Sequence, residues 1–229
     1  MWQTDSPVVI VAMTSLLGEV PQSAGSFFWL GSVDFCVEPL LFPFQHLPDS
    51  FNSDYEYTQS EGKHCHNYAL NFYLPVHGTI VFAADDYSFR SALNATLCMW
   101  WEITGKYSPP IPLIRQRIAE FKELRPYFYG DYYPLTPVNG YLRNDTWLAY
   151  QMDRPKHHDG IILAFRRADC PDDSVRVQLS GLEKEATYEL FFEDYELTIQ
   201  KQGNELANGI DLFSPTKLSS LLIRYKKLN

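Results

Sequence analysis

Apolar residues recur every three to four positions between residues 111 and 124, which predicts an amphipathic helix. The apolar stripe consists of Ile111, Ile114, Ile118, Phe121 and Leu124. Charged residues such as Arg117 fill the positions between them and are expected on the solvent side. Pro112 suits the first turn of a helix, and Pro126 disfavours a helical conformation at the residue before it. We therefore expect this helix to end near Arg125.

An aromatic segment follows the helix directly, around an expected turn at Gly130 and Asp131. Its aromatic residues are Tyr127, Phe128, Tyr129, Tyr132 and Tyr133. Before this segment, short apolar runs are mixed with helical patterns, and beyond it apolar and polar residues alternate with a period of two. We interpret residues 121–136 as the joint between an α/β part and an all-β part.

The α/β part shows three further elements ahead of the long helix. Residues 65–74 fit a short helix that carries Asn67 and Asn71 on one face. A β-branched run at 78–83 predicts a strand. Residues 97–101 are apolar enough for a buried strand, although they also fit the tail of a preceding helix.

The all-β part contains seven candidate strands separated by turn-rich clusters. They are residues 147–152, 160–166, 175–179, 188–192, 197–200, 205–212 and 218–225. Short strands at intervals of about ten residues are typical of an antiparallel β-sandwich.

The charge and hydropathy of the chain exclude several classes of partner. Its 229 residues are 45% hydrophobic and carry a formal net charge of −9. Such a chain is expected to fold, and it is a poor match for nucleic acid or an anionic membrane. The apolar run at 8–17 is too short to span a bilayer and lacks the basic flank of a signal peptide.

The four cysteines are widely spaced and form no zinc-binding pattern. They are Cys36, Cys65, Cys98 and Cys170. Scattered cysteines in a chain of this size are expected to be reduced thiols, which favours a cytoplasmic location.

Three groups of residues carry candidate chemistry. Asp85 and Asp86 suit acid–base work or a metal, but two acids ahead of an apolar helix are more often a helix cap and its solvated neighbour. His64 and His66 are possible metal ligands, yet no third ligand is evident, so we expect no metal site. Trp101 lies beside another tryptophan and an acid, which suits sugar stacking or, more commonly, a core.

Several motifs, in the same order, resemble the C-terminal half of bacterial α-galactosidase-like proteins of glycoside hydrolase family 36. They include HCHNYALNFYLPVHGT (64–79), DDYSFRSALN (85–94), IAEFKELRPYFYGDYYPLT (118–136) and WLAYQMDRP (147–155). The resemblance covers about residues 53–229. It implies the last β/α units of a (β/α)8 TIM barrel at 53–136, followed by a C-terminal antiparallel β-sandwich at 137–229. Residues 1–52 do not match.

The resemblance also implies a function. Such enzymes are retaining glycosidases that remove terminal α-linked galactose or N-acetylgalactosamine with two aspartates and no cofactor. The acid/base aspartate of the family follows a serine shortly before the C-H-x-Y-x-L motif, and Asp54 occupies that place. Ser53 beside it, and Trp101 on the stacking argument, are the candidate substrate-binding residues.

The departures from the family are as informative as the matches. The family's nucleophile lies in a Lys-x-Asp segment, and residues 1–62 contain no Lys or Arg but eight acids. A complete barrel needs about 250 residues, and this chain offers about 136 before the expected sandwich. We therefore expect an incomplete family member whose first 52 residues come from a truncated, rearranged or frameshifted reading frame.

Two functional outcomes remain open at this stage. The chain is either an enzyme, alone or completed by another chain, or a non-catalytic remnant or carbohydrate-binding module. An incomplete barrel exposes strand edges, which favours a homo-oligomer or a complementing chain. The acids to examine as a second carboxylate are Asp85, Asp86 and Glu102.

Overall fold

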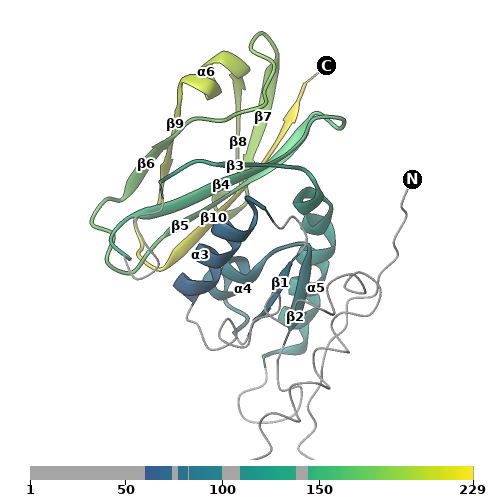
Figure 1. Cartoon of the computed structure of the whole chain (residues 1–229), viewed down its shortest axis with the longest axis vertical. Coiled ribbons are helices and arrows are strands. Elements are labelled where there is room, and N and C mark those ends of the chain that lie inside the picture. Colours follow the sequence, from purple (N-terminus) through teal and green to yellow (C-terminus); the bar gives the residue numbers. More distant parts are fainter. Residues whose placement is uncertain (1–59, 74–76, 82, 100–108, 138–143, 229) are drawn as a thin grey trace, which may run out of the picture.

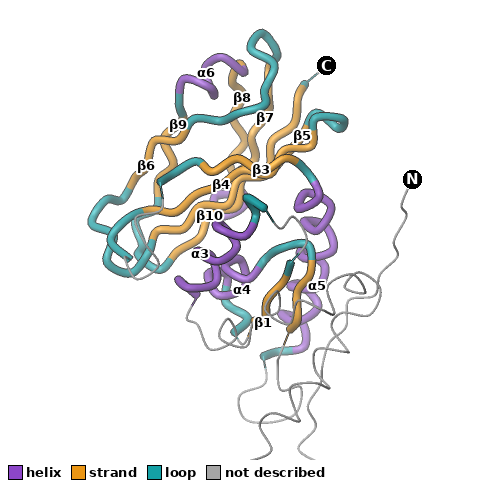
Figure 2. The backbone as a smooth tube through the Cα atoms, viewed as in Figure 1, coloured by secondary structure: helices purple, strands orange, loops and turns teal. Residues whose placement is uncertain are grey.

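The computed structural model of this chain describes residues 60–73, 77–81, 83–99, 109–137 and 144–228. These residues form three layers (Figure 1): helices with two short strands, a large sheet across the middle, and a small sheet with one helix on the far side. Figure 2 shows most of the helices gathered on one face of the large sheet. The apolar run at 8–17 lies outside the described residues.

The helical layer contains a parallel β–α–β unit. The elements of this layer are α3 (Ser60–Leu70), β1 (Gly78–Val81), α4 (Asp86–Ala92), β2 (Thr96–Met99) and α5 (Ile111–Leu124). Strands β1 and β2 pair in parallel with α4 between them in the chain, so residues 97–99 of the run at 97–101 are a strand, and the last two lie outside the described residues. The long helix is confirmed with Pro112 in its first turn and Arg125 at its C-cap. Among the described helices, none combines the length and apolarity that crossing a bilayer requires.

The large sheet has six strands and is antiparallel throughout. In spatial order they are β3 (Asp131–Pro134), β4 (Trp147–Arg154), β5 (Asp159–Arg166), β10 (Ser219–Lys227), β7 (Thr187–Phe192) and β8 (Leu197–Gln202). A separate two-stranded sheet pairs β6 (Ser174–Val177) with β9 (Ile210–Phe213). The antiparallel all-β part predicted from the two-residue period is therefore confirmed.

Two local predictions are corrected by the structure. The first is the turn at Gly130 and Asp131: the chain bends at Gly130 after a 3-10 helix, η3 (Arg125–Tyr129), but Asp131 already belongs to strand β3. A Cβ atom at Gly130 would overlap the carbonyl oxygen of Asp153, so only glycine lets the chain enter β3 against β4. The aromatic residue Tyr132 is therefore a strand residue, paired in register with Met152 of β4.

The second wrong prediction is a continuous strand at 205–212. The chain forms a short helix, α6 (Gly203–Asn208), before β9 begins at Ile210. A capping box between Gln202 and Glu205 starts this helix, and Gly209 ends it at a φ of 124°. Alternation of apolar residues across the segment concealed these helix signals.

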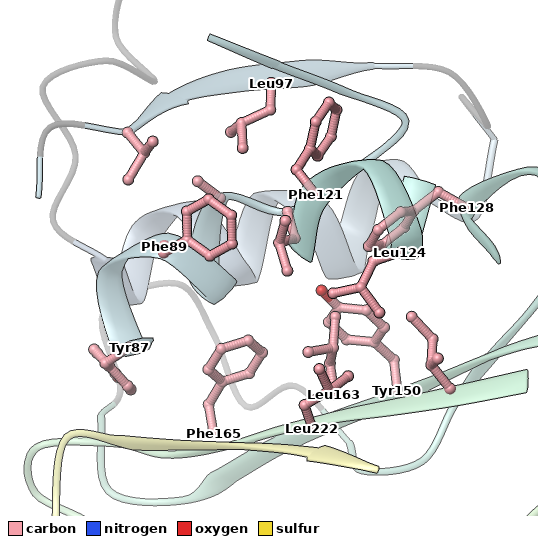
Figure 3. Packing of buried hydrophobic residues seen from close by; sticks show 14 of the residues in the cluster. Tyr87, Phe89, Leu97, Phe121, Leu124, Phe128, Tyr150, Leu163, Phe165 and Leu222 are labelled. Carbon is pink, nitrogen blue, oxygen red and sulfur yellow. The ribbon is translucent and has the colours of Figure 1, made fainter. Parts of the chain in front are cut away.

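The central strands are buried on both faces. Toward the helices, one hydrophobic cluster joins side chains of α4, α5 and η3 to β4, β5 and β10 (Figure 3); it includes Phe89, Phe121, Leu124, Phe128, Tyr150, Leu163, Phe165 and Leu222. The opposite face packs on β6, β9 and α6 through a second cluster, which includes Ala149, Ile162, Leu179, Leu190, Leu206, Leu212 and Ile223. The helical layer and the small sheet therefore depend on the same strands.

We predict that Leu163→Ala lowers the free energy of unfolding by about 2–5 kcal/mol, because it leaves a cavity under the helices. Leu163 is fully buried. Urea denaturation of the full chain measures the effect. The matched control is Leu197→Ala on the edge strand β8, where the side chain is 48% exposed and the loss is expected to be small. Equal losses in the two variants would contradict the shared core.

Candidate functional site

The carboxyl ends of β1 and β2 mark the edge where the resemblance expects a site. Because the strands are parallel, Val81 and Met99 lie at the same edge. Ligands of α/β folds bind at the carboxyl ends of parallel strands. Four of the residues considered above lie outside the described residues: Ser53, Asp54, Trp101 and Glu102. The described part of the chain therefore does not test these predicted site residues, and their roles stay predictions.

The two acids that follow β1 have structural partners. Asp85 is the N-cap of α4, and its Oδ1 accepts a hydrogen bond of 2.9 Å from the backbone N–H of Ser88. The carboxylate of Asp86 forms an ion pair with Arg117. The interpretation of this pair as a helix cap and an exposed neighbour is confirmed. Neither carboxylate stands free as a second catalytic group.

The prediction that Arg117 faces solvent is wrong. The side chain is 5% exposed, and its Nε donates to the carbonyl oxygen of Ala84 at 2.9 Å. Its Nη1 also donates to Glu120 at 2.7 Å, in addition to the pair with Asp86. Arg117 thus lies on the polar side of α5 and is nevertheless buried. It pairs there with Asp86 of α4 and with Glu120 of its own helix.

Arg90 extends this ion network from the helices to the large sheet. Its Nε lies 3.3 Å from Glu120, and its Nη1 lies 2.6 Å from Asp194 of η4 (Glu193–Tyr195) and 3.3 Å from the carbonyl oxygen of Ser220. Burial alone would lower the pKa of Arg90, but the charges of Asp194 and Glu120 raise it overall. Asp194 also accepts from the backbone N–H of Leu222. The network fixes α4 and α5 on strand β10.

His64 behaves as a core histidine. Its Nδ1 lies 3.3 Å from the Ser91 hydroxyl, and its ring stacks on Phe165 with 4.7 Å between the centroids. Burial, with the nearby charge of Arg167, holds the pKa of His64 well below its usual value. Within the described ranges no group of three or more His, Cys, Asp or Glu side chains is placed to hold a metal ion.

A second polar cluster lies at the amino ends of β1 and β2. His77 precedes β1 and Asn94 precedes β2; their side chains meet at 2.7 Å, and His77 also lies 3.2 Å from Oδ1 of Asn67. Asn67 donates to the carbonyl oxygens of Ser91 and Leu93 at 3.0 and 3.1 Å. All three clustered side chains are fully buried. The hydrogen bonds of this cluster join the starts of the two strands to α3 and the end of α4, at the edge opposite the one where parallel α/β folds bind ligands.

The sequence placed Asn67 on one helix face but missed its two partners. His77 and Asn94 sit in connections with no periodic pattern, and only the fold brings them to Asn67. A polar residue directly ahead of each short apolar run is the one local signal that points to them.

We predict that acid destabilises the protein through His64. The unfolded chain binds a proton near pH 6.5 and the folded chain does not, so the free energy of unfolding falls below that pH by about 1.4 kcal/mol per pH unit until the folded pKa is reached. Burial also lowers the pKa of His66, which adds a loss of the same sign.

Urea denaturation of His64→Gln at about pH 7.5 and about pH 5.5 tests this linkage. The variant should lose less stability on acidification than the wild type. His157→Gln, in the exposed turn between β4 and β5, should lose as much as the wild type. An unchanged acid loss in His64→Gln would show that another group carries the effect.

Comparison with known proteins gives structural matches alone. No protein-family model and no curated protein sequence matches the chain. The described fold is similar to the galactosidase domain of the α-galactosidase–sucrose kinase AgaSK, with a TM-score of 0.59 and 18% identity over 75% of this chain and 25% of that one. It is equally similar to the family 36 α-galactosidase AgaB of Geobacillus stearothermophilus, with a TM-score of 0.59 and 19% identity over 75% and 25%.

An α-galactosidase of Lactobacillus brevis matches with a TM-score of 0.51 and 18% identity over 76% of this chain and 26% of that one. The chain therefore spans about a quarter of the length of the solved structures that it matches. At these identities the likeness establishes the fold, not the activity. The described residues have the fold of part of the family 36 α-galactosidases, and the large antiparallel sheet corresponds to their C-terminal domain.

Proposed function

We propose that this chain is part of a retaining glycoside hydrolase of the α-galactosidase type, and that it supplies the acid/base residue Asp54. The observation that carries the proposal is the likeness of the described fold to α-galactosidases over three quarters of the chain, with the motifs in family order. In this proposal β1, α4, β2 and α5 are the last β/α units of a TIM barrel. The six-stranded and two-stranded sheets are its C-terminal β-sandwich.

The proposed reaction needs two carboxyl groups and no cofactor. Asp54 donates its proton to the glycosidic oxygen while a nucleophilic carboxylate attacks the anomeric carbon and forms a covalent glycosyl intermediate. Asp54 then removes a proton from water, which attacks the same carbon and releases the carboxylate with retention of configuration. The two carboxyl groups of such a site lie about 5–5.5 Å apart. The substrate class is a terminal α-linked galactose or N-acetylgalactosamine.

We propose that the nucleophile comes from another chain or segment that completes the barrel. Asp85 is bound as a helix cap and Asp86 is paired with Arg117, so neither is assigned this role. The Lys-x-Asp segment of the family has no counterpart in residues 1–62. A complementing chain would also pair the edges of the short β1–β2 sheet, which have no further partner strand among the described residues.

The second candidate function is carbohydrate binding without hydrolysis. The same engagement of Asp85 and Asp86 favours it, because a folded chain without a nucleophile retains binding surfaces but not the covalent step. Catalytic assays separate the two candidates.

Hydrolysis of an α-galactoside tests the proposal, measured for the purified full chain alone and mixed with a family 36 barrel fragment that carries the Lys-x-Asp nucleophile, with Asp54→Asn as the variant. We expect about a 10²–10⁴-fold loss of kcat on raffinose, whose sugar leaving group needs a proton. The loss should be smaller on an aryl α-galactoside, because a phenolate leaves without protonation. A general acid produces this difference between substrates, whereas loss of a nucleophile affects both substrates alike.

Asp85→Asn is the matched control, since asparagine caps a helix about as well as aspartate. This variant should keep the wild-type rate on both substrates. Hydrolysis abolished by Asp85→Asn but not by Asp54→Asn would reverse the assignment of the acid. A folded wild-type chain that is inactive on both substrates, alone and with that barrel fragment, would overturn hydrolysis and leave the binding function.

A further inference from the structure

A groove on the far side of the large sheet has the features of a ligand site. It lies between edge strand β8, helix α6 and strand β9, away from the β1–β2 unit (Figure 1). Its volume of about 700 Å³ falls within the range of about 300–1,000 Å³ typical of small-molecule sites. The acids that follow β1, His64 and the cluster of His77, Asn94 and Asn67 do not line it.

The walls of this groove carry exposed aromatic rings. Tyr195, at the end of η4, is 45% exposed, and Phe213, at the end of β9, is 49% exposed. The buried side chains of Phe192 and Ile210 lie behind them and give the groove an apolar lining. Exposed apolar side chains that gather beside polar groups are typical of binding surfaces.

The two aromatic walls are fixed to each other. The Tyr195 hydroxyl donates a hydrogen bond of 2.8 Å to the carbonyl oxygen of Phe213, which joins η4 to the last residue of β9. That carbonyl oxygen therefore already accepts one hydrogen bond, which leaves one lone pair for an incoming strand. This contact favours a compact ligand over an extended peptide added to the edge of β9.

A planar charged group lies at another part of the wall. Arg176 pairs with Asp211 at 3.0 Å across β6 and β9. A Cβ atom at Gly209 would come within 2.7 Å of the Arg176 Nε, so the glycine keeps space for this guanidinium. The arrangement presents N–H donors and carboxylate acceptors side by side.

The charges that line the groove balance. Lys201 lies 3.8 Å from Glu205, as a second opposite-charge pair beside Arg176 and Asp211. An anionic or cationic ligand would need an excess of one sign, and the groove offers two charges of each. Paired donors and acceptors next to aromatic faces suit a neutral ligand with many hydroxyl groups and an apolar C–H face.

We infer that this groove binds a neutral oligosaccharide, with a sugar ring packed on Phe213 and Tyr195 and its hydroxyls on Arg176 and Asp211. This site is separate from the proposed catalytic edge and does not require that the chain hydrolyse anything. The proposed function enters only in the choice of an α-galactoside as the probe.

Titration of raffinose into the full chain by isothermal calorimetry tests the inference. We expect saturable binding that is weakened about tenfold or more by Phe213→Ala, since this removes one aromatic face from the ligand. Tyr129→Ala is the matched control, because Tyr129 is also 49% exposed but lies in η3, outside the groove. This control should bind like the wild type. Thermal unfolding confirms that each variant is folded.

Asp54→Asn separates the two sites, because it prevents raffinose turnover and should leave groove binding intact. A folded wild-type chain that binds no raffinose overturns the inference. So does unchanged binding by Phe213→Ala. Binding lost in Asp54→Asn but kept in Phe213→Ala would place the sugar at the proposed catalytic edge, which overturns the groove and supports the proposed function.

Discussion

The structure depends on central strands that bury both of their faces. Ile162 and Leu163 are neighbours in β5, yet their side chains belong to different hydrophobic clusters. A shift of strand register by one residue would exchange the two clusters and place every side chain on the wrong layer. Polar contacts on the far face oppose such a shift: Tyr225 donates to Asp153 at 2.5 Å, and Gln151 donates to Tyr225 at 2.7 Å. Burial raises the pKa of Asp153, although the hydrogen bond from Tyr225 opposes the rise.

The ion network around Arg90 orients the helices on the sheet that this packing buries. Breaking a buried ion pair leaves an uncompensated charge at a cost of about 3–5 kcal/mol, whereas an apolar replacement of the whole network is often neutral. The network therefore specifies how α4 and α5 sit on the sheet more than it adds to stability. Its acids, Glu120 and Asp194, come from α5 and η4. Asp85 and Asp86, the two acids that follow β1, are likewise bound in a helix cap and an ion pair, so their carboxylates contribute to the structure.

Local signals in the sequence predicted what local physics decides. Pro112 and Arg125 bound α5, and Asp85 caps α4, because proline geometry and capping depend on a few adjacent residues. Burial of Arg117 was not predictable in this way, since its partners come from another helix and from the next turn of its own. The mistaken strand at 205–212 has a different origin: the capping box of Gln202 and Glu205 and the glycine at 209 are local helix signals, but the alternation of apolar residues concealed them. The candidate catalytic residue Asp54 rests on resemblance alone.

Stability and function fall on different residues in this fold. The charged groups next to β1 are bound in an ion pair and a helix cap. The amide cluster at the other edge joins the starts of the strands, so the polar side chains named in the β–α–β unit all make structural contacts. The groove differs, because its exposed rings, Tyr195 and Phe213, add little to either hydrophobic cluster. An exposed aromatic pair that the core does not need is free to meet a ligand. Binding at the groove thus requires nothing beyond the described residues, whereas the proposed hydrolysis requires Asp54 and a second carboxylate, and Asp85 and Asp86 are held by the fold.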